Sequence, residues 1–176
     1  MSLDGHQPEV FDNIAGLKPG APVRLAGVEE GAVSRVDLKG DLGGTKGDSW
    51  GYSESPLVDG DTLVCTPGGD AAMMVGLDKK TGKELWRCPL EGCRGAGHSS
   101  IVISTVGGRK VYVQTTASGA CGVDAATGKL LWSYPIDQTT AVIPTPIVRG
   151  DLVFFSAGYR DRKSTRLNSS HVKRSR

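Results

Sequence analysis

A short stretch that occurs twice decides the fold of this chain. Residues 76–86 read GLDKKTGKELW and residues 122–132 read GVDAATGKLLW, with seven of eleven positions identical at an offset of 46. The shared Asp can start a tight turn by accepting backbone N–H groups, and the shared Gly can adopt the positive φ that a hairpin reversal needs. The Trp four residues after that Gly is a large flat group suited to packing between neighbouring sheets.

A second element recurs with nearly the same period. Residues 55–58, 100–103 and 145–148 read SPLV, SIVI and TPIV, 45 residues apart. Between these elements, short apolar runs alternate with Gly- and Asp-rich turns, which is typical of β-strands joined by hairpins. The expected strands are 55–58, 62–66, 72–77 and 83–88 in one unit, and 101–105, 110–116, 120–124 and 129–134 in the next. Four short strands in each unit of about 40–45 residues indicate a propeller blade.

We therefore predict an all-β fold in which residues 41–160 form an incomplete β-propeller, with two four-stranded blades and part of a third. Residues 1–40 are expected to be a short β-rich segment, with strands at 23–26 and 32–38. A closed propeller has roughly 4–8 blades, so we expect the chain to be a fragment with unpaired blade faces and marginal stability. Residues 161–176 are expected to be a disordered basic tail.

The repeat carries a family resemblance. The pattern Asp-x-x-Thr-Gly-Lys-x-Leu-Trp at 78–86 and 124–132 resembles the repeat of the PQQ-binding-like, or quinoprotein-type, β-propellers. Residues 50–69 and 141–159 resemble the openings of blades in bacterial PQQ-like repeat proteins. This resemblance implies a periplasmic or exported parent protein, acting either as a non-catalytic scaffold or as a quinoprotein oxidoreductase similar to alcohol dehydrogenases.

The front of the chain resembles a different family. Residues 10–38 are similar to the core of the MCE (mammalian cell entry) domain of bacterial lipid-transport proteins. The matching marks are Phe11-Asp12-Asn13-Ile14, Gly16-Leu17-Lys18, Pro22-Val23, Gly27-Val28 and Gly31-x-Val33. Two interpretations stay open. The chain is either a chimera of two genes, one of them a lipid-transport component, or its first 40 residues are ordinary propeller strands that mimic the MCE pattern.

The tail has an unusual composition. Residues 161–176 read DRKSTRLNSSHVKRSR, with six Lys or Arg and one Asp. A nucleic-acid or anionic-membrane arm is one interpretation, although the aromatic residues that usually accompany such an arm are missing. Residues 161–171 resemble, at all eleven positions, the translation of a widely used sequencing adapter. We interpret them as adapter-derived, so we expect no evolved function there and a natural gene that continues beyond Arg160.

The acidic residues do not form a recognisable cofactor site. The resemblance to quinoproteins implies a carboxylate base, a calcium site of acidic and Asn side chains, and often a pair of adjacent cysteines. Asp78 and Asp124 belong to the repeat turn, and Asp59 and Asp61 are expected in another turn. Glu54 is the acid that the repeat explains least.

The cysteines do not show a metal-binding pattern. No pair is adjacent, and Cys88-x4-Cys93 has no second pair at zinc-site spacing. We interpret Cys65, Cys88 and Cys121 as free thiols on strands, and a Cys88–Cys93 disulfide stays open for a periplasmic parent.

One histidine lies in a loop beside hydroxyl groups. His98 precedes Ser99 and Ser100, but we expect no carboxylate to orient it and no nucleophile elbow. Residues 43–48 are Gly-rich, yet they lack the Gly-Lys-Ser/Thr order of a phosphate-binding loop. We therefore predict no catalytic, cofactor-binding or metal-ligating residue in this chain.

The remaining predictions concern partners and location. No run approaches the ~18 apolar residues of a membrane-spanning helix, and residues 1–6 lack the basic segment and apolar core of a signal peptide. We expect no independent enzymatic activity from this chain and a scaffold or binding role for the full-length propeller, with a protein partner and no nucleic acid. PQQ and calcium stay open as cofactors only for the full-length parent.

Overall fold

The computed structural model describes residues 22–25, 28–32, 37–136, 141–156 and 170–171. Within these ranges the chain forms thirteen β-strands and no α-helix. The strands make four antiparallel sheets, none of them closed into a barrel. The prediction of an all-β, incomplete propeller is confirmed.

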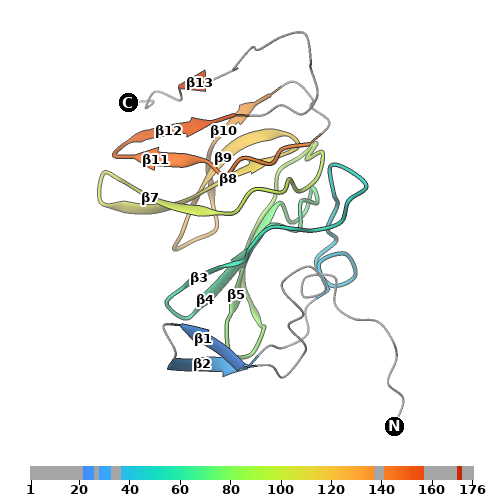
Figure 1. Ribbon diagram of the computed structural model, residues 1–176, viewed down its shortest axis with the longest axis vertical. Helices are drawn as coiled ribbons and strands as arrows, with labels where there is room; N and C mark the ends of the chain where they lie inside the picture. Colours follow the sequence, from blue (N-terminus) through green and yellow to red (C-terminus); the bar gives the residue numbers. More distant parts are fainter. Residues whose placement is uncertain (1–21, 26–27, 33–36, 137–140, 157–169, 172–176) are drawn as a thin grey trace.

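The first two units of the repeat are two complete blades (Figure 1). The first blade contains β3 (Leu57–Asp59), β4 (Thr62–Cys65), β5 (Met74–Asp78) and β6 (Glu84–Cys88), hydrogen-bonded in that order. The second contains β7 (Val102–Val106), β8 (Arg109–Thr116), β9 (Gly119–Asp124) and β10 (Leu130–Pro135), again in chain order. Each predicted strand of the two units corresponds to an observed one, with small shifts at the ends.

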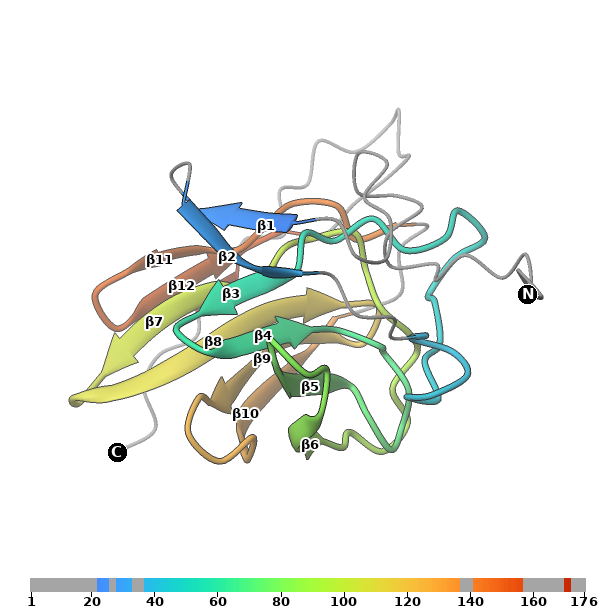
Figure 2. The same ribbon diagram turned by 90° about the horizontal axis from the view of Figure 1, so that it is seen from below.

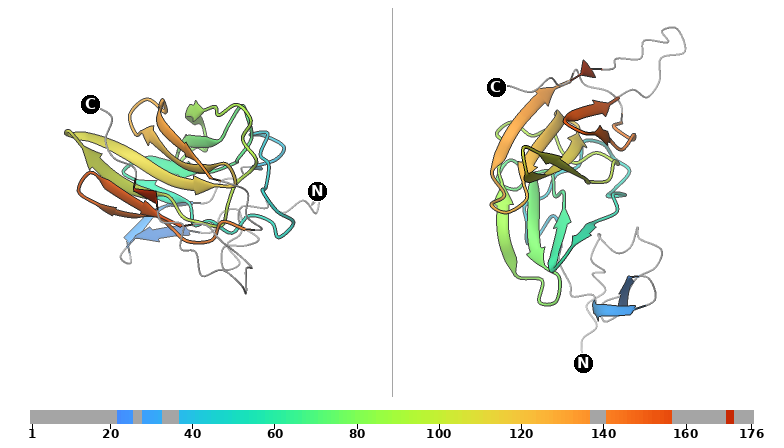
Figure 3. Two further views of the ribbon diagram at one scale, coloured as in Figure 1. Left: turned by 90° about the horizontal axis from the view of Figure 1, so that it is seen from above. Right: turned by 90° about the vertical axis from the view of Figure 1, so that its left-hand side faces the viewer.

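A third sheet continues the series. Strands β11 (Ile147–Arg149) and β12 (Leu152–Phe155) form a hairpin, and the two-residue β13 (Ser170–His171) pairs with β12. Figure 3 shows the first blade, the second blade and this sheet following one another along the molecule. Of the predicted disordered tail, residues 170–171 thus belong to β13, and 161–169 and 172–176 lie outside the described residues.

The front of the chain differs from its prediction. A hairpin forms from β1 (Pro22–Leu25) and β2 (Val28–Ala32), so the second strand lies earlier than the expected 32–38. At the predicted end of that strand, the Asp37 carboxylate accepts the N–H groups of Lys39 and Gly40, each at 2.9 Å. These bonds reverse the chain into a turn, because an Asp side chain that captures nearby backbone amides competes with strand pairing. The earlier part of the front, including residues 10–18, lies outside the described residues.

The cores lie where sheets face one another. One apolar cluster joins the first two blades and includes Val64, Met74, Ile101 and Tyr112. A second lies between the second blade and the third sheet, and a third covers the first blade with Leu38, Leu42 and Tyr52. The tips of the equivalent hairpins β3–β4, β7–β8 and β11–β12 point the same way (Figure 2), as expected for successive blades of one propeller.

Candidate functional site

The repeated aspartates build turns, as the sequence predicts. Asp78 Oδ1 accepts hydrogen bonds from Thr81 N at 2.7 Å, Thr81 Oγ1 at 2.8 Å and Lys80 N at 3.1 Å. Asp124 makes the same set with Thr127 N, Thr127 Oγ1 and Ala126 N at 2.9, 2.9 and 3.0 Å. The hydrogen bonds from the two threonines lower the pKa of each carboxyl below its ordinary value. Both acids are therefore charged turn formers with their acceptors in use.

The repeated tryptophan joins two blades. Trp86 lies over Gly76 of its own blade, where an added Cβ would overlap the indole ring. Its other side meets Gly128 in the turn of the second blade, where a Cβ would lie 2.6 Å from Trp86 Cε3. The ring also stacks on Tyr112, with centroids 6.0 Å apart and planes 22° apart. The predicted packing between neighbouring sheets is confirmed for this residue.

The acids of the first hairpin also reach their neighbours. Asp59 accepts hydrogen bonds from Lys110 Nζ at 2.8 Å and from Tyr112 Oη at 2.7 Å, both in the second blade. The Lys110 bond lowers the pKa of Asp59. Asp61 faces Lys79 within its own blade, at 3.5 Å. Asp59 is thus a turn residue that also forms an ion pair across the first blade junction.

Glu54, which the repeat explained least, lies in a buried polar network. Its Oε1 accepts Thr66 N at 2.6 Å, and its Oε2 accepts Gln114 Nε2 at 2.8 Å. Because Gln114 lies on β8, its bond to Glu54 connects the first unit to the second, and Gln114 also accepts the Ser99 hydroxyl at 2.7 Å within the second unit. Burial raises the pKa of Glu54 to about 7 despite the hydrogen bonds from Thr66 and Gln114, which favour the charged form.

Equivalent positions of successive units are linked by hydroxyl groups. Ser55 N donates to Ser100 Oγ at 3.3 Å, and Ser100 N donates to Thr145 Oγ1 at 3.1 Å. Each step spans 45 residues, so the hydrogen bonds follow the repeat itself. We call these two bonds the hydroxyl ladder.

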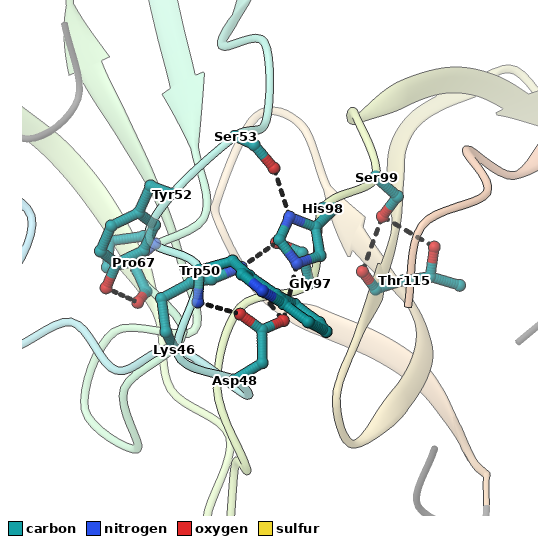
Figure 4. A network of polar contacts seen from close by, with 10 residues as sticks. All are labelled: Lys46, Asp48, Trp50, Tyr52, Ser53, Pro67, Gly97, His98, Ser99 and Thr115. Atoms are coloured by element: carbon teal, nitrogen blue, oxygen red, sulfur yellow. Dashed lines mark hydrogen bonds and ion pairs between the residues drawn. The ribbon is translucent and has the colours of Figure 1, made fainter. Parts of the chain in front are cut away.

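His98 has partners that sequence reasoning missed (Figure 4). Its Nε2 lies 2.7 Å from Asp48 Oδ2, and its Nδ1 is hydrogen-bonded to Ser53 Oγ. The expectation that no carboxylate orients this histidine is wrong, because chain segments 50 residues apart lie side by side at the blade entrances. A parallel bridge between Lys46 and Ala96 fixes that alignment. The 45-residue step from Ser53 to His98 was the one available signal in the sequence.

Two further side chains border this cluster. The Trp50 ring lies 6.0 Å from the His98 ring, centroid to centroid, and is 56% exposed. Lys46 Nζ donates to Gly97 O at 2.8 Å and lies 3.8 Å from Asp48 Oδ2. Burial lowers the pKa of Lys46, while Asp48 and Glu54 act to raise it. The loop at 43–48 therefore contributes an acid and a base to the cluster.

The four cysteines are free and buried in the structure. Cys65, Cys88 and Cys121 lie on strands, as predicted, and Cys93 lies in the loop after β6. Burial raises the pKa of each thiol, that of Cys88 to about 11. Neutral buried thiols act as small apolar groups rather than as nucleophiles.

One open cavity of about 340 Å³ lies at the end of β9 and β10. Its lining includes Glu91, Arg94, Ser118 and Tyr134. The guanidinium of Arg94 donates to Ile136 O at 2.6 Å, and Arg94 N donates to Ser118 Oγ at 2.7 Å, so these polar groups hold the loop in place.

The resemblance to quinoproteins implies a calcium site built from acidic side chains, which can be compared with the described residues. Among them, no three His, Cys, Asp or Glu side chains gather closely enough to hold a metal ion. The acids of the repeats are engaged in turns and blade junctions instead. Within the same residues, no helix is long and apolar enough to span a membrane.

Comparisons with known families agree with both resemblances. The model of a family described as outer membrane protein assembly factor BamB matches residues 32–173. A family described as MlaD protein matches residues 10–48, so the two matches overlap at 32–48. The predicted PQQ-like repeat and MCE-like segment are confirmed, while the adapter origin of 161–171 stays a prediction. No curated protein sequence matches the chain.

Proposed function

The chain belongs to the family described as outer membrane protein assembly factor BamB, and from that premise we propose that it forms part of a non-catalytic propeller. In this proposal the full-length propeller is a scaffold that binds other proteins of the bacterial cell envelope while they assemble. The family description supports this role, and with it a periplasmic or exported location for the parent protein.

One observation carries the proposal: the acidic side chains of the repeats are used in contacts that hold the blades themselves together. Asp78 and Asp124 close turns, Asp59 pairs with the next blade, and Glu54 accepts two hydrogen bonds inside the first junction. A carboxylate that acts as a catalytic base needs a free lone pair directed at substrate. Side chains used in this way instead support a rigid surface whose loops and exposed strands meet a partner.

The alternatives are two. A PQQ-dependent oxidoreductase would require a quinone and calcium site, and PQQ and calcium would have to be held by blades of the full-length parent. A lipid-transport role rests on the short match of residues 10–48 to the MlaD family and on the β1–β2 hairpin within it.

A binding experiment with three readouts separates these roles. The purified chain is incubated with PQQ and Ca²⁺, desalted and examined for quinone absorbance, and its lipid content is measured after extraction. In parallel, a urea-unfolded outer-membrane β-barrel protein is diluted beside the chain with a crosslinker, and an α-helical protein of similar size is the control. We expect crosslinks to the β-barrel protein alone, with no retained quinone. Retained quinone with alcohol-dependent dye reduction would overturn the scaffold proposal, and bound phospholipid without crosslinks would favour lipid transport.

A further inference from the structure

The cluster at His98 has the connectivity of a proton relay (Figure 4). The Ser53 hydroxyl can donate to His98 Nδ1 while His98 Nε2–H donates to Asp48 Oδ2 at 2.7 Å. In this tautomer the carboxylate holds the imidazole with a basic nitrogen directed at a hydroxyl group. Activated serines are recognised by this geometry and these roles rather than by their order in the chain.

The base of this relay is held in place before any substrate arrives. Asp48 Oδ1 accepts Trp50 N at 2.9 Å, so the carboxylate cannot turn freely away from the histidine. His98 N donates to Val142 O at 2.7 Å, which ties the histidine backbone to the next unit. The side chains of His98 and Asp48 are 13% and 9% exposed. A preorganised and partly desolvated base loses little entropy when it acts.

The exposure of Ser53 distinguishes this relay from the other serine network of the molecule. Ser99 is also hydrogen-bonded on several sides, but it is 1% exposed and is enclosed by Gln114 and Thr115. Ser53 is exposed to solvent, so a ligand can reach its hydroxyl oxygen. A hydroxyl group that only supported the fold would not need to face solvent next to an oriented base.

We infer that Ser53 is an activated nucleophile that accepts an acyl group from an activated ester. In this step Ser53 Oγ forms a bond to the acyl carbon as the ester C–O bond breaks. The hydroxyl proton passes to His98 Nδ1 and then to the departing alcohol or phenol, so charge and atoms balance. Water can later release the acyl group as a carboxylic acid by the same route. This activity goes beyond the proposed scaffold role and does not depend on it: showing it would leave partner binding untouched and would replace only the statement that the propeller is non-catalytic.

An aromatic side chain borders the relay at His98, so aryl esters are the substrate class to try first. The Trp50 ring flanks the imidazole, with the ring centroids 6.0 Å apart. Aryl acetates are therefore the simplest probes of the site.

The test uses p-nitrophenyl acetate and the full 176-residue chain. We expect release of about one p-nitrophenol per chain and an acetyl group located on Ser53 by peptide mass spectrometry. Ser53→Ala should abolish this release, and His98→Gln should slow it by about 10²- to 10⁴-fold, the usual contribution of a general base. Ser133→Ala is the matched control, because Ser133 is an exposed serine on β10 outside the relay.

Asp48 is a positioning residue in this inference, and its test needs a readout that folding alone would not change. In Asp48→Asn the imidazole loses the carboxylate that orients it, while the side chains of Ser53 and His98 stay in place. Asp48→Asn should lower the maximal acylation rate and leave the p-nitrophenyl acetate concentration at half-maximal rate unchanged, and Asp48→Glu should restore part of the rate. No acylation of the wild-type chain, equal acylation in Ser53→Ala, or a wild-type acylation rate in His98→Gln would each overturn the inference.

Discussion

The two blade junctions of this molecule are formed by the same repeat, yet they differ in what the repeated tryptophan contacts. At the first junction, Trp86 lies between Gly76 of its own blade and Gly128 of the next blade. At the second, Trp132 lies over Gly122 of its own blade and packs on the cluster that contains Val153 and Phe155. The Asp-x-x-Thr-Gly turn that would supply a second glycine occurs twice in the chain and not a third time.

The polar contacts follow the same division. The first junction has the Asp59–Lys110 ion pair, the Asp59–Tyr112 hydrogen bond and the buried contact of Glu54 with Gln114. The second has the Ser100–Thr145 bond and the His98–Val142 backbone bond, and no ion pair joins described residues across it. The comparison teaches that one repeat sequence makes only half of a junction, and that the next repeat must supply the other half.

The largest test removes each tryptophan in turn. Trp86→Ala is expected to destabilise the chain by about 3–5 kcal/mol, because it empties a space enclosed from both blades. Trp132→Ala should cost roughly half as much, since Gly122 of its own blade is the one described glycine that lies against its ring. Urea unfolding measures both values when it is followed by the circular dichroism of the backbone rather than by tryptophan fluorescence. Equal losses would show that the two junctions are energetically alike.

The next test uses Glu54, the buried acid of the first junction. The pKa of Glu54 is raised from its ordinary 4.5 to about 7 in the fold, so the folded state binds the proton more tightly. This tighter proton binding by Glu54 stabilises the fold fully below pH 4.5, and the stabilisation is lost as the pH rises through 7. The free energy of unfolding changes on the order of 3 kcal/mol over this range. We expect the urea concentration at the unfolding midpoint to decrease as the pH is raised from 5 to 8, and to decrease less in Glu54→Gln. An identical slope in both chains would contradict the assignment.

A smaller effect is expected from the glycine that touches Trp86. Gly128 has φ +70° and meets the indole, so Gly128→Ala should cost about 2 kcal/mol through backbone strain and overlap together. Gly108→Ala is the matched control, because Gly108 has φ +77° in the same blade but open space around it. It should show the strain alone, about 1 kcal/mol. If both variants have the same thermal midpoint, the contact with Trp86 contributes nothing.

The smallest effect concerns the exposed side of the first junction. Asp59→Asn should lower stability by about 1 kcal/mol or less, because Lys110 is half exposed and solvent screens the pair. Raising the salt concentration should reduce the difference between wild type and variant. Asp61→Asn, which changes a more exposed acid within one blade, should have a smaller effect still. A loss in Asp61→Asn as large as in Asp59→Asn would remove the distinction between the two acids.

Much of this fold could be predicted from the sequence, because it depends on local periodic signals. The doubled Asp-x-x-Thr-Gly turn and the alternation of apolar runs placed all eight strands of the two blades, and the role of Trp86 followed from its shape. The strand expected at 32–38 does not extend to Asp37 and Leu38, because the Asp37 carboxylate accepts nearby backbone N–H groups and forms a turn there, while residues 33–36 lie outside the described residues. The sequence pattern does not distinguish such a turn from an extended segment.

The cluster at His98 could not be predicted in the same way. Asp48 comes within 2.7 Å of His98 only because the segments entering successive blades lie in parallel alignment, which is a tertiary fact. Asp48 lies in a loop without a motif, and Ser53 is one of several serines near a strand. The repeat period identifies positions that meet across a junction, but it does not say which chemistry results when the residues at those positions differ.

The hydroxyl ladder has a consequence for how such a chain can grow. Each unit presents one N–H and one hydroxyl at the same position, 45 residues from the next. The N–H of one unit therefore donates to the hydroxyl oxygen of the following unit. A tandem duplication of residues 55–99 would therefore keep the N–H and hydroxyl groups of the hydroxyl ladder in register. A deletion of a few residues within one unit would leave one bond of the ladder unmade. Gene duplication in whole units is thus the easy evolutionary step for this architecture, and blade number becomes a quantity that can change by integers.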